Sequence, residues 1–358
     1  MLWDPGNMTI REDFEKREDA FISPYGVKAS ASAGRREPEP ACPVRTVFQQ
    51  DRDRIVFCNA FRRLKHKTQV FLSPLGDHYR TRLTHTLEVA EVARTICRAM
   101  RLNEDLAEAV ALGHDLGHTP FGHSGETALK EIFSAEFNHS EQSLRVVDVL
   151  ERNGRGLNLT REVRDGIVKH SKGFGDIIPA DPGKMAATVE GRIVRFADII
   201  AYLNHDLDDA VRSGVVRQND IPEICVKTLG GTHAQRATTM IRDLIFSSRV
   251  MDAHLELAFS DEVFSAMSEL RQFLYENVYR SAPVHAEFIK AKKLISELYA
   301  YFLNHPDQLR EKMTGLEMEE GYFESTPVER IICDYIASMT DRYVLRLYNE
   351  IFIPTPLV

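Results

Sequence analysis

The amino-acid sequence predicts an all-α fold, and three features support this prediction. Apolar residues recur at helical spacing along most of the 358 residues, which is typical of amphipathic helices. No segment alternates apolar and polar residues strongly enough to predict a strand. Hydrophobic residues make up 43% of the chain, which is enough to build a sizeable core. We therefore expect a helical bundle, with at most a small hairpin within residues 214–233.

The first 50 residues differ in composition from the rest of the chain. They contain five prolines, and residues 30–40 show no periodicity, so the sequence predicts an N-terminal arm here. Two interpretations of the arm are open. It is either a solvated loop or a basic lid in which Arg35 or Arg36 reaches an anionic ligand or a neighbouring subunit.

Helices are predicted from residue 48 onward. The strongest signal covers residues 81–100, where Leu83, Leu87 and Ala90 recur at helical spacing. A segment rich in Gly, Asp and Pro predicts a loop at 172–184. The predicted helices are 48–70, 81–100, 104–114, 126–133, 141–151, 160–170, 190–211, 234–249, 261–279, 286–303 and 327–351.

The same pattern predicts three parts in the chain. We expect the arm at 1–50, a core at 51–212, and a helical C-terminal region at 213–358 that packs on the core.

Composition narrows the functional classes. The net charge of -8 argues against bulk nucleic-acid binding. Five scattered cysteines without a Cys-x-x-Cys pair indicate neither a disulfide framework nor a zinc knuckle. No apolar run is long enough to span a bilayer, and the N-terminus does not resemble a signal peptide. We therefore expect a cytoplasmic protein with no membrane partner.

The segment His114-Asp115-Leu116-Gly117-His118 is the most informative one. It follows a run of helix formers, and Gly117 and Pro120 are expected to end the helix. His114 and His118 are four residues apart, so they share a helical face. Imidazole nitrogens and carboxylate oxygens are suitable ligands for divalent metals. A bare His-Asp dipeptide is most often an ordinary helix end, so the metal hypothesis depends on the surrounding pattern.

A second polar pattern lies in the predicted helix 190–211. Asp198, Tyr202 and Asp206 are spaced four and four, so they form one stripe. The other residues of this helix are mostly apolar, so it is expected to be buried on most sides. Its polar stripe must then face other polar groups, an ion or a wet cavity.

Taken together, these segments resemble the HD-domain superfamily of metal-dependent phosphohydrolases, whose pattern is H…HD…D. More closely, they resemble the bacterial deoxyguanosinetriphosphate triphosphohydrolase-like proteins, the dNTP triphosphohydrolases. The resemblance implies an HD-domain helical bundle with additional C-terminal helices. It is carried, in the same order along the chain, by Ala60–Phe71, Thr81–Arg94, Ala111–Glu126, Asn138–Val147, Glu190–Ala210 and Ser338–Leu345.

The resemblance implies one divalent metal ion per active site, held by four residues. Two imidazoles and two carboxylates leave positions open for water and a phosphate oxygen. Such ligands suit Mn, Fe, Co, Ni, Zn or Mg. The implied ligands are His85, His114, Asp115 and Asp198.

The resemblance also implies catalytic and substrate-binding residues. His118 and Glu126 are expected to act as a histidine–carboxylate pair, with His139 as a phosphate-facing donor or proton carrier. The implied substrate-binding residues are Arg82, Tyr202 and Asp206. Tyr202 would pack on the deoxyribose and Asp206 would bond its 3′-hydroxyl.

Other histidines were weighed against the same pattern. His66, His170 and His205 are interpreted as structural or outer-sphere residues, whereas His123 fits a core and a functional role equally well. Arg63 and Gln69 are candidates for the nucleotide pocket by resemblance alone.

The activity implied by the resemblance is hydrolysis of deoxynucleoside triphosphates to deoxynucleoside and tripolyphosphate. Two alternatives are open. The first is another HD phosphohydrolase, acting on nucleoside monophosphates, cyclic nucleotides or single-stranded DNA ends. The second is a nucleotide or single-stranded DNA sensor without catalysis. The resemblance further predicts a homo-oligomer.

Overall fold

The computed structural model describes residues 8–70, 79–171, 177–179, 181–252, 254–314, 318 and 320–354. Within these residues the chain is helical except for one two-stranded sheet, which confirms the predicted fold class. The helices of the N-terminal two thirds are α1 (Ile10–Phe21), α2 (Val47–Phe57), α3 (Asn59–Arg63), α4 (Arg82–Ala99), α5 (Glu104–Gly113), α6 (His123–Ile132), α7 (His139–Arg145), α8 (Arg161–Lys169), α9 (Val189–Arg212), α10 (Glu223–Leu229) and α11 (His233–Ser247).

The hairpin and the C-terminal helices complete the chain. Strands β1 and β2 pair antiparallel, with Val250 opposite Leu255. These elements are β1 (Arg249–Met251), β2 (His254–Glu256), α12 (Asp261–Leu274), α13 (Ala282–Asn304), α14 (Pro306–Thr314), α15 (Glu320–Ser325), α16 (Val328–Ser338) and α17 (Asp341–Phe352).

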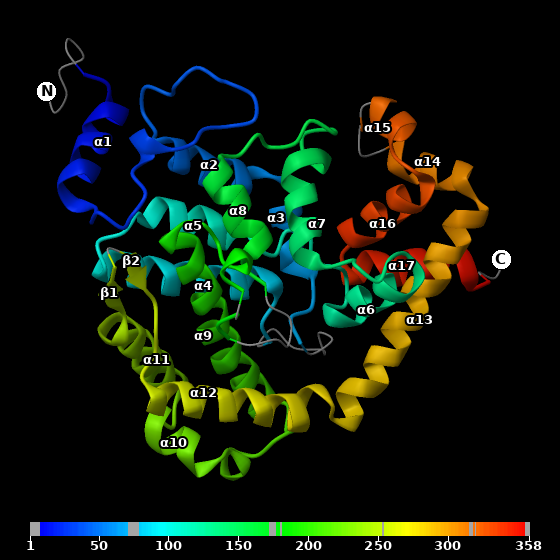
Figure 1. Cartoon of the computed structure of the whole chain (residues 1–358). Helices are drawn as coiled ribbons and strands as arrows, with labels where there is room; N and C mark the ends of the chain where they lie inside the picture. Colours follow the sequence, from blue (N-terminus) through cyan, green and yellow to red (C-terminus); the bar gives the residue numbers. More distant parts are fainter. Residues whose placement is uncertain are drawn as a thin grey trace, which may run out of the picture.

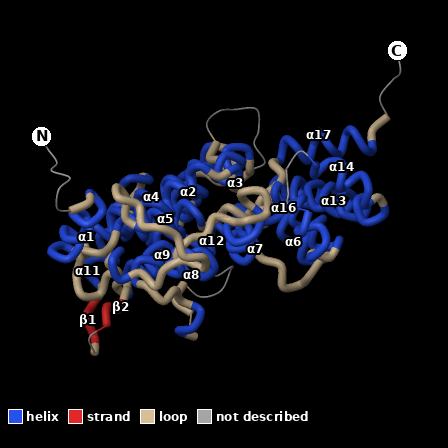
Figure 2. The backbone as a smooth tube through the Cα atoms, turned by 90° about the horizontal axis from the view of Figure 1, so that it is seen from above, coloured by secondary structure: helices blue, strands red, loops and turns tan. Residues whose placement is uncertain are grey.

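Helices α4, α5 and α9 pack on one another in the left-hand half of the view in Figure 1. Helix α4 packs on both α5 and α9, and α8 packs on α9 beside them. Seen from above, α1 lies at one end of the molecule and α14 and α17 at the other (Figure 2). The long helix α13 connects the two regions and packs on α6, α16 and α17.

Two hydrophobic clusters hold these helices together. The first contains the inward faces of α2, α4, α5, α8 and α9, and it extends through α10, α11 and α12. The second joins α13, α14, α16 and α17 to α6 through Ala128 and Leu129. The boundary between the two hydrophobic clusters therefore lies near α13, whereas the sequence predicted a boundary at residue 212. The predicted three-part division of the chain stays a prediction.

Two of the predicted helices are interrupted. The helix predicted at 48–70 breaks at Cys58, whose extended backbone ends α2 and whose Sγ accepts a hydrogen bond from the Phe61 N–H. The carboxylate of Glu151 accepts the N–H groups of Asn59 and Ala60, which stabilises the new helix start. The helix predicted at 327–351 breaks before Thr340, whose side chain caps α17.

One further expectation for the fold was wrong. Residues 214–233 form α10 and turns, and the hairpin lies instead at 249–256. Cys225 and Leu229 are buried one helical turn apart, which explains the helix. The N-terminal arm at 1–50 stays a prediction, but it is not a loop throughout. It contains α1, which begins with a capping box between Thr9 and Glu12.

The lid hypothesis for Arg35 is also wrong. Arg35 forms an ion pair with Asp51, whose side chain is fully buried, and its guanidinium donates to the Asn158 carbonyl at 2.7 Å. Arg36 lies 3.5 Å from the carboxylate of Asp148. Both arginines therefore bind this chain's own carboxylates, and Arg35 fastens the N-terminal region to the core.

Candidate metal centre and active site

Three helices bring the predicted metal ligands together. His85 lies in the first turns of α4, His114 and Asp115 directly follow the last residue of α5, and Asp198 lies in the middle of α9. Because α4 packs on α5 and on α9, residues more than 100 positions apart meet at one point.

The donor atoms of these side chains converge. The Nε2 atoms of His85 and His114 are 3.3 Å apart, and they lie 3.8 and 3.6 Å from Asp115 Oδ2. A point equidistant from these three atoms is about 2.1 Å from each, which matches the length of a metal–nitrogen or metal–oxygen bond. Asp198 Oδ1 lies 3.2 Å from His85 Nε2 on the same side. The side chains of His85, His114 and Asp115 therefore fit a divalent cation, and Asp198 contacts one of these three ligands.

Hydrogen bonds orient both histidines. His114 donates its Nδ1–H to the carbonyl of Ala111 at 2.6 Å, so its Nε2 carries a lone pair. His85 Nδ1 lies 2.8 Å from Nε2 of His205, and His205 Nδ1 lies 2.7 Å from a carboxylate oxygen of Asp206 in a bent contact. The nearby Asp206 carboxylate favours the His205 tautomer with its proton on Nδ1, although the contact does not have hydrogen-bond geometry. In that tautomer, His205 Nε2 accepts a hydrogen bond from His85.

The three residues Asp206, His205 and His85 therefore form a relay. In this relay, Nε2 of His85 carries a lone pair that points at His114. The arrangement resembles a carboxylate–histidine–metal triad with one additional histidine. Asp206 also accepts the hydroxyl of Tyr279 at 2.6 Å. These contacts give Asp206 a supporting role, and its contact with a sugar hydroxyl stays a prediction.

Arg82 supports the central carboxylate. Its guanidinium donates to Asp115 Oδ2 at 2.5 Å and to the carbonyls of Thr68 and Gln69 at 3.2 and 3.4 Å. Burial raises the pKa of Asp115, but the nearby His114 and Arg82 lower it more, so the net pKa is well below its ordinary value. Asp115 is therefore ionised before any cation binds. The predicted contact of Arg82 with substrate stays a prediction.

Asp198 is the most solvent-exposed of the four predicted metal ligands. Its side chain is 22% exposed, whereas those of His85, His114 and Asp115 are at most 3% exposed. Although burial raises the pKa of Asp198, the close contact with His85 and the charges of the neighbouring histidines lower it below its ordinary range. A phosphate oxygen or a water molecule would therefore approach from the side of α9.

The predicted catalytic residues surround the other face of Asp115. His139, the first residue of α7, contacts Glu126 of α6 through Nδ1 at 3.1 Å. His118 stacks on His139 with ring centroids 4.6 Å apart. The structure therefore pairs Glu126 with His139. The ring of His118 stacks on the ring of His139, and a ring nitrogen of His118 lies within 4.8 Å of a carboxylate oxygen of Glu126.

The protonation of these groups differs. Burial lowers the pKa of His139, but its hydrogen bond with Glu126 raises it more, so the net pKa is raised. Burial and the charge of Arg82 lower the pKa of His118 well below its ordinary value, so it is neutral at physiological pH. The Nδ1 atom of His118 is buried and has no hydrogen-bond partner among the described residues.

His170 is the residue that the sequence analysis underestimated. It follows α8, and its Nε2 lies 3.3 Å from Nε2 of His139 and 4.0 Å from Oδ1 of Asp115. An isolated histidine at a helix end carries no spacing signal, so only the packing of α8 against α7 and α9 shows that it belongs to this cluster.

The turn between α5 and α6 is held from the C-terminal region. Phe121 and Gly122 both have positive φ angles. Asp341 of α17 accepts the N–H of Phe121 and that of Thr68, both at 2.8 Å. Lys67 is buried and donates to the carbonyls of His118 and Ala337. The C-terminal helices therefore fix the turn that positions His118.

Gly117 is needed because of a close backbone approach. A Cβ atom at this position would lie 2.1 Å from the backbone nitrogen of Ser143, too close for any side chain. This approach lets α7 bring His139 up against the His114–His118 turn.

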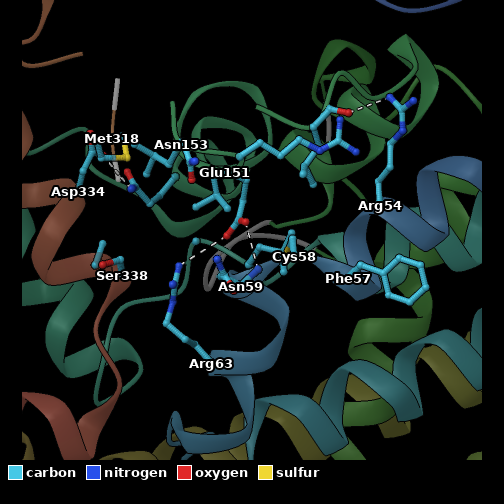
Figure 3. Close-up of a pocket in the computed structure, with 18 of the residues that line it drawn as sticks. Arg54, Phe57, Cys58, Asn59, Arg63, Glu151, Asn153, Met318, Asp334 and Ser338 are labelled. Carbon is cyan, nitrogen blue, oxygen red and sulfur yellow. Dashed lines mark hydrogen bonds and ion pairs between the residues drawn. The ribbon is translucent and has the colours of Figure 1, made fainter. Parts of the chain in front are cut away.

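A cavity of about 470 Å³ lies behind this turn. Leu116 and Gly117 form part of its wall, but none of the predicted metal, catalytic or substrate-binding residues lines it. Figure 3 shows Arg63 directed at Glu151, which is 3.7 Å away, with Asp334 and Ser338 on the other side. Arg63 therefore belongs to this cavity, separate from the histidine cluster.

Tyr202 lies one turn beyond Asp198 on α9 and is half buried. Burial raises the pKa of its hydroxyl, while a hydrogen bond with Arg271 opposes this shift. Its contact with a sugar stays a prediction. No helix among the described residues combines the length and apolarity needed to cross a membrane.

Two protein families match this chain. The HD domain family matches residues 82–203, which include the four predicted ligands and the three predicted catalytic residues. The phosphohydrolase-associated domain family matches residues 257–350.

Close relatives cover nearly the entire chain. A deoxyguanosinetriphosphate triphosphohydrolase-like protein of Desulfatibacillum aliphaticivorans is 62% identical over 98% of this chain and 100% of the relative. A protein of the same description from Caldanaerobacter subterraneus is 50% identical over 98% of this chain and 97% of the relative. Another from Geobacter sulfurreducens is 38% identical over 97% of this chain and 99% of the relative.

Proposed function

The chain belongs to the family of deoxyguanosinetriphosphate triphosphohydrolase-like proteins and is an HD-domain phosphohydrolase; from this premise we propose that it hydrolyses deoxynucleoside triphosphates to the deoxynucleoside and tripolyphosphate. The observation that carries the proposal is the convergence of His85, His114, Asp115 and Asp198 beside the Glu126–His139 pair. The names of the relatives supply the class of substrate.

The four predicted ligands would hold the cation, and the surroundings of each favour this role. His85 and His114 present lone pairs because their Nδ1 atoms donate elsewhere. Asp115 and Asp198 are ionised. When bound, the cation would act as a Lewis acid toward a phosphate oxygen and offset the negative charge of the triphosphate.

The proposed reaction breaks the bond between the α-phosphorus and O5′ of the sugar. Water adds to the α-phosphorus, and O5′ leaves with a proton to become the sugar hydroxyl. His139 suits the donation of that proton, because Glu126 favours its protonated form. His118 is neutral and stacked beside it, so it suits acceptance of a proton from the attacking water.

The experiment is a product analysis with a substrate panel. Protein reconstituted with Mn²⁺ is incubated with each dNTP alone, with the four mixed, and with ribonucleotides, nucleoside monophosphates, cyclic nucleotides and single-stranded DNA. Phosphorus NMR then identifies the product. We expect intact tripolyphosphate and deoxynucleoside from at least one dNTP condition.

The matched control is Glu126→Gln, which keeps all four ligands. It should retain bound Mn²⁺ but lose roughly 10²–10⁴-fold in rate, as expected on removing a positioned acid–base group. Hydrolysis of monophosphates or DNA ends without tripolyphosphate would favour another HD phosphohydrolase. Tight dNTP binding without turnover, across metals and mixtures, would favour a sensor.

A further inference from the structure

The block Ser338–Leu345 is part of the family resemblance, but it contains none of the predicted ligand, catalytic or substrate-binding residues. It covers the end of α16 and the start of α17. Its Asp341, the first residue of α17, is buried, and the carboxylate accepts hydrogen bonds from residues 220 and 273 positions earlier in the chain. Asp341 therefore connects the C-terminal region to two distant parts of the core.

The two carboxylate oxygens of Asp341 accept from different segments. Oδ1 accepts the backbone N–H of Phe121 at 2.8 Å. Oδ2 accepts both the backbone N–H of Thr68, at 2.8 Å, and the Thr68 hydroxyl. Asp341 thus holds residues 118–122, here called the catalytic turn, beside the segment 67–69.

The backbone of the catalytic turn requires such support. Phe121 has a φ angle of 59°, in the left-handed region that bulky residues rarely adopt. Gly122, with the same φ, precedes the first residue of α6, the helix that carries Glu126. Strained backbone of this kind persists only where its surroundings fix it. The hydrogen bond from Phe121 to Asp341 therefore helps to set the direction in which α6 begins.

The segment 67–69 supports the other side of the site. The Thr68 carbonyl accepts from Arg82 at 3.2 Å, and the same guanidinium donates to the central carboxylate. The turn packs closely on this arrangement. A Cβ atom at Gly122 would lie 3.2 Å from the carbonyl oxygen of Gln69 and 3.4 Å from a guanidinium nitrogen of Arg82. Asp341 therefore joins the support of the catalytic turn to the support of the metal centre.

Lys67 makes a second connection between the same parts. Its side chain is buried, and its Nζ donates to the carbonyl of His118 and, at 2.8 Å, to the carbonyl of Ala337 near the end of α16. Each of two side chains therefore links the catalytic turn to the C-terminal helices.

We propose that Asp341 is a positioning residue for phosphate hydrolysis, which fixes the catalytic turn against the segment 67–69 and so keeps His118 and Glu126 in their places. The inference rests on the proposed function for the reaction but not for these contacts. The four predicted metal ligands lie on or directly after α4, α5 and α9, which pack directly on one another. Loss of Asp341 should therefore affect proton transfer more than metal binding.

The test replaces Asp341 by asparagine in the full-length protein. The side chain keeps its size, but its amide nitrogen must then meet one of the two backbone N–H donors. We expect kcat to fall about 10–100-fold because a small displacement of acid–base groups is enough for such a loss. KM and bound Mn²⁺ should change little. Hydrogen exchange measured by mass spectrometry should become faster in residues 118–126.

A second background separates positioning from a general structural effect. Residues that act as one unit have non-additive effects on the rate. Asp341→Asn should therefore cause a clearly smaller loss of kcat in Glu126→Gln protein, where the position of the acid–base pair matters less. An equal loss of kcat in both backgrounds would overturn the inference.

The matched control is Asp51→Asn. Asp51 is also buried, and its Oδ2 accepts the N–H and the hydroxyl of Thr160 at 2.8 and 2.7 Å, in the same pattern as Asp341 and Thr68. It fastens the N-terminal region, so its loss should lower the thermal midpoint without changing kcat or the exchange of residues 118–126. If Asp341→Asn folds poorly, Lys67→Met provides a second variant, which should also lower kcat and speed the exchange.

The outcomes separate this inference from the proposed function. A folded Asp341→Asn protein with wild-type kcat, or with wild-type exchange in the catalytic turn, would overturn the inference and leave the function standing. Hydrolysis of a phosphate compound other than a dNTP, with the same loss of kcat in Asp341→Asn, would do the reverse. The exchange measurement needs no substrate, so it tests the contacts of Asp341 independently of the reaction.

Discussion

The pKa values of buried carboxylates shift in opposite directions in two regions of this molecule. At the metal centre, the pKa values of Asp115, Asp198 and Glu126 are all lowered. At the junction of α1, α5 and α9, burial raises the pKa of Glu18 and that of Glu190 to about 7. Burial raises the pKa of the carboxylates in both regions, so the neighbouring groups determine whether the net pKa is raised or lowered.

The difference lies in the charge of those neighbours. Arginine and imidazole groups surround the carboxylates of the centre, and they favour the ionised form. Among the residues that the structure describes, the donors to Glu190 are neutral backbone N–H groups, chiefly those of Val27 and Asn103, and they do not offset the loss of water. The carboxylates of the centre therefore stay ionised, which favours cation binding, whereas the acids at the junction keep their protons to a higher pH than an ordinary glutamate.

The largest effect is expected from replacing Asp115, the central ligand of the proposed metal centre. Asp115→Asn should remove the central negative charge of the proposed metal centre and leave Arg82 buried without an anion. Loss of one partner of a buried pair costs about 3–5 kcal/mol of unfolding free energy. We expect bound Mn²⁺ and phosphate hydrolysis to be abolished and the thermal midpoint to fall.

Elemental analysis and thermal denaturation check this prediction. Asp19→Asn is the control, because Asp19 forms an ion pair with Lys28 at the surface and its side chain is 60% exposed. A folded Asp115→Asn protein that kept both metal and hydrolysis would show that Asp115 is not a ligand.

A smaller effect is expected from the relay behind His85. His205→Leu removes the acceptor that fixes the His85 tautomer but no ligand, so metal affinity should fall about 10–100-fold. Asp206→Asn should have a similar effect, because an amide no longer requires the proton on His205 Nδ1. Mn²⁺ titrations measure both effects, with the exposed His254→Leu as control.

The same variants test the sequence-based assignment of Asp206. If Asp206 binds the sugar, Asp206→Asn should raise KM without a change in metal affinity. If it supports the relay, metal affinity should fall in both variants, and excess Mn²⁺ should restore the rate of Asp206→Asn.

The sequence predicted most of this centre because part of its pattern is local. His114, Asp115 and His118 lie within five residues, so they are close in space although α5 ends at Gly113 and a turn carries them. His85 and Asp198 came from resemblance, and the packing of α4 on α5 and α9 agrees with it. His170 was assigned a minor role because its partners lie on other helices, and spacing carries no information about packing.

The errors in the fold have the same physical origin. The break at Cys58 depends on the carboxylate of Glu151, which is distant in sequence and caps α3. The start of α1 was different, since Thr9 and Glu12 form a capping box that could have been recognised locally. The surrounding prolines favoured an arm instead. Local signals therefore predicted well which segments are helical, whereas the positions of the helix ends depended on long-range contacts.

The smallest effect is expected at the junction, far from the cation. The Oε1 atom of Glu190 accepts two backbone N–H groups, while its buried Oε2 has no hydrogen-bond partner among the described residues, which suits a protonated acid. Because the folded pKa is about 7 and the ordinary value is 4.5, the folded state retains a proton that the unfolded state loses. The stabilisation is therefore complete below pH 4.5 and is lost as pH rises through 7.

Glu190→Gln should remove this part of the pH dependence. The amide keeps an acceptor for Val27 and Asn103 but does not ionise, so unfolding free energy should fall less between pH 5 and pH 8 than in wild type. The change is at most about 3 kcal/mol over that range, and Glu18 retains part of the slope. Urea denaturation at several pH values measures it, with the surface variant Glu223→Gln as control. An unchanged slope in Glu190→Gln would mean that Glu190 is ionised in the folded protein, and the contrast between the two regions would then not extend to this residue.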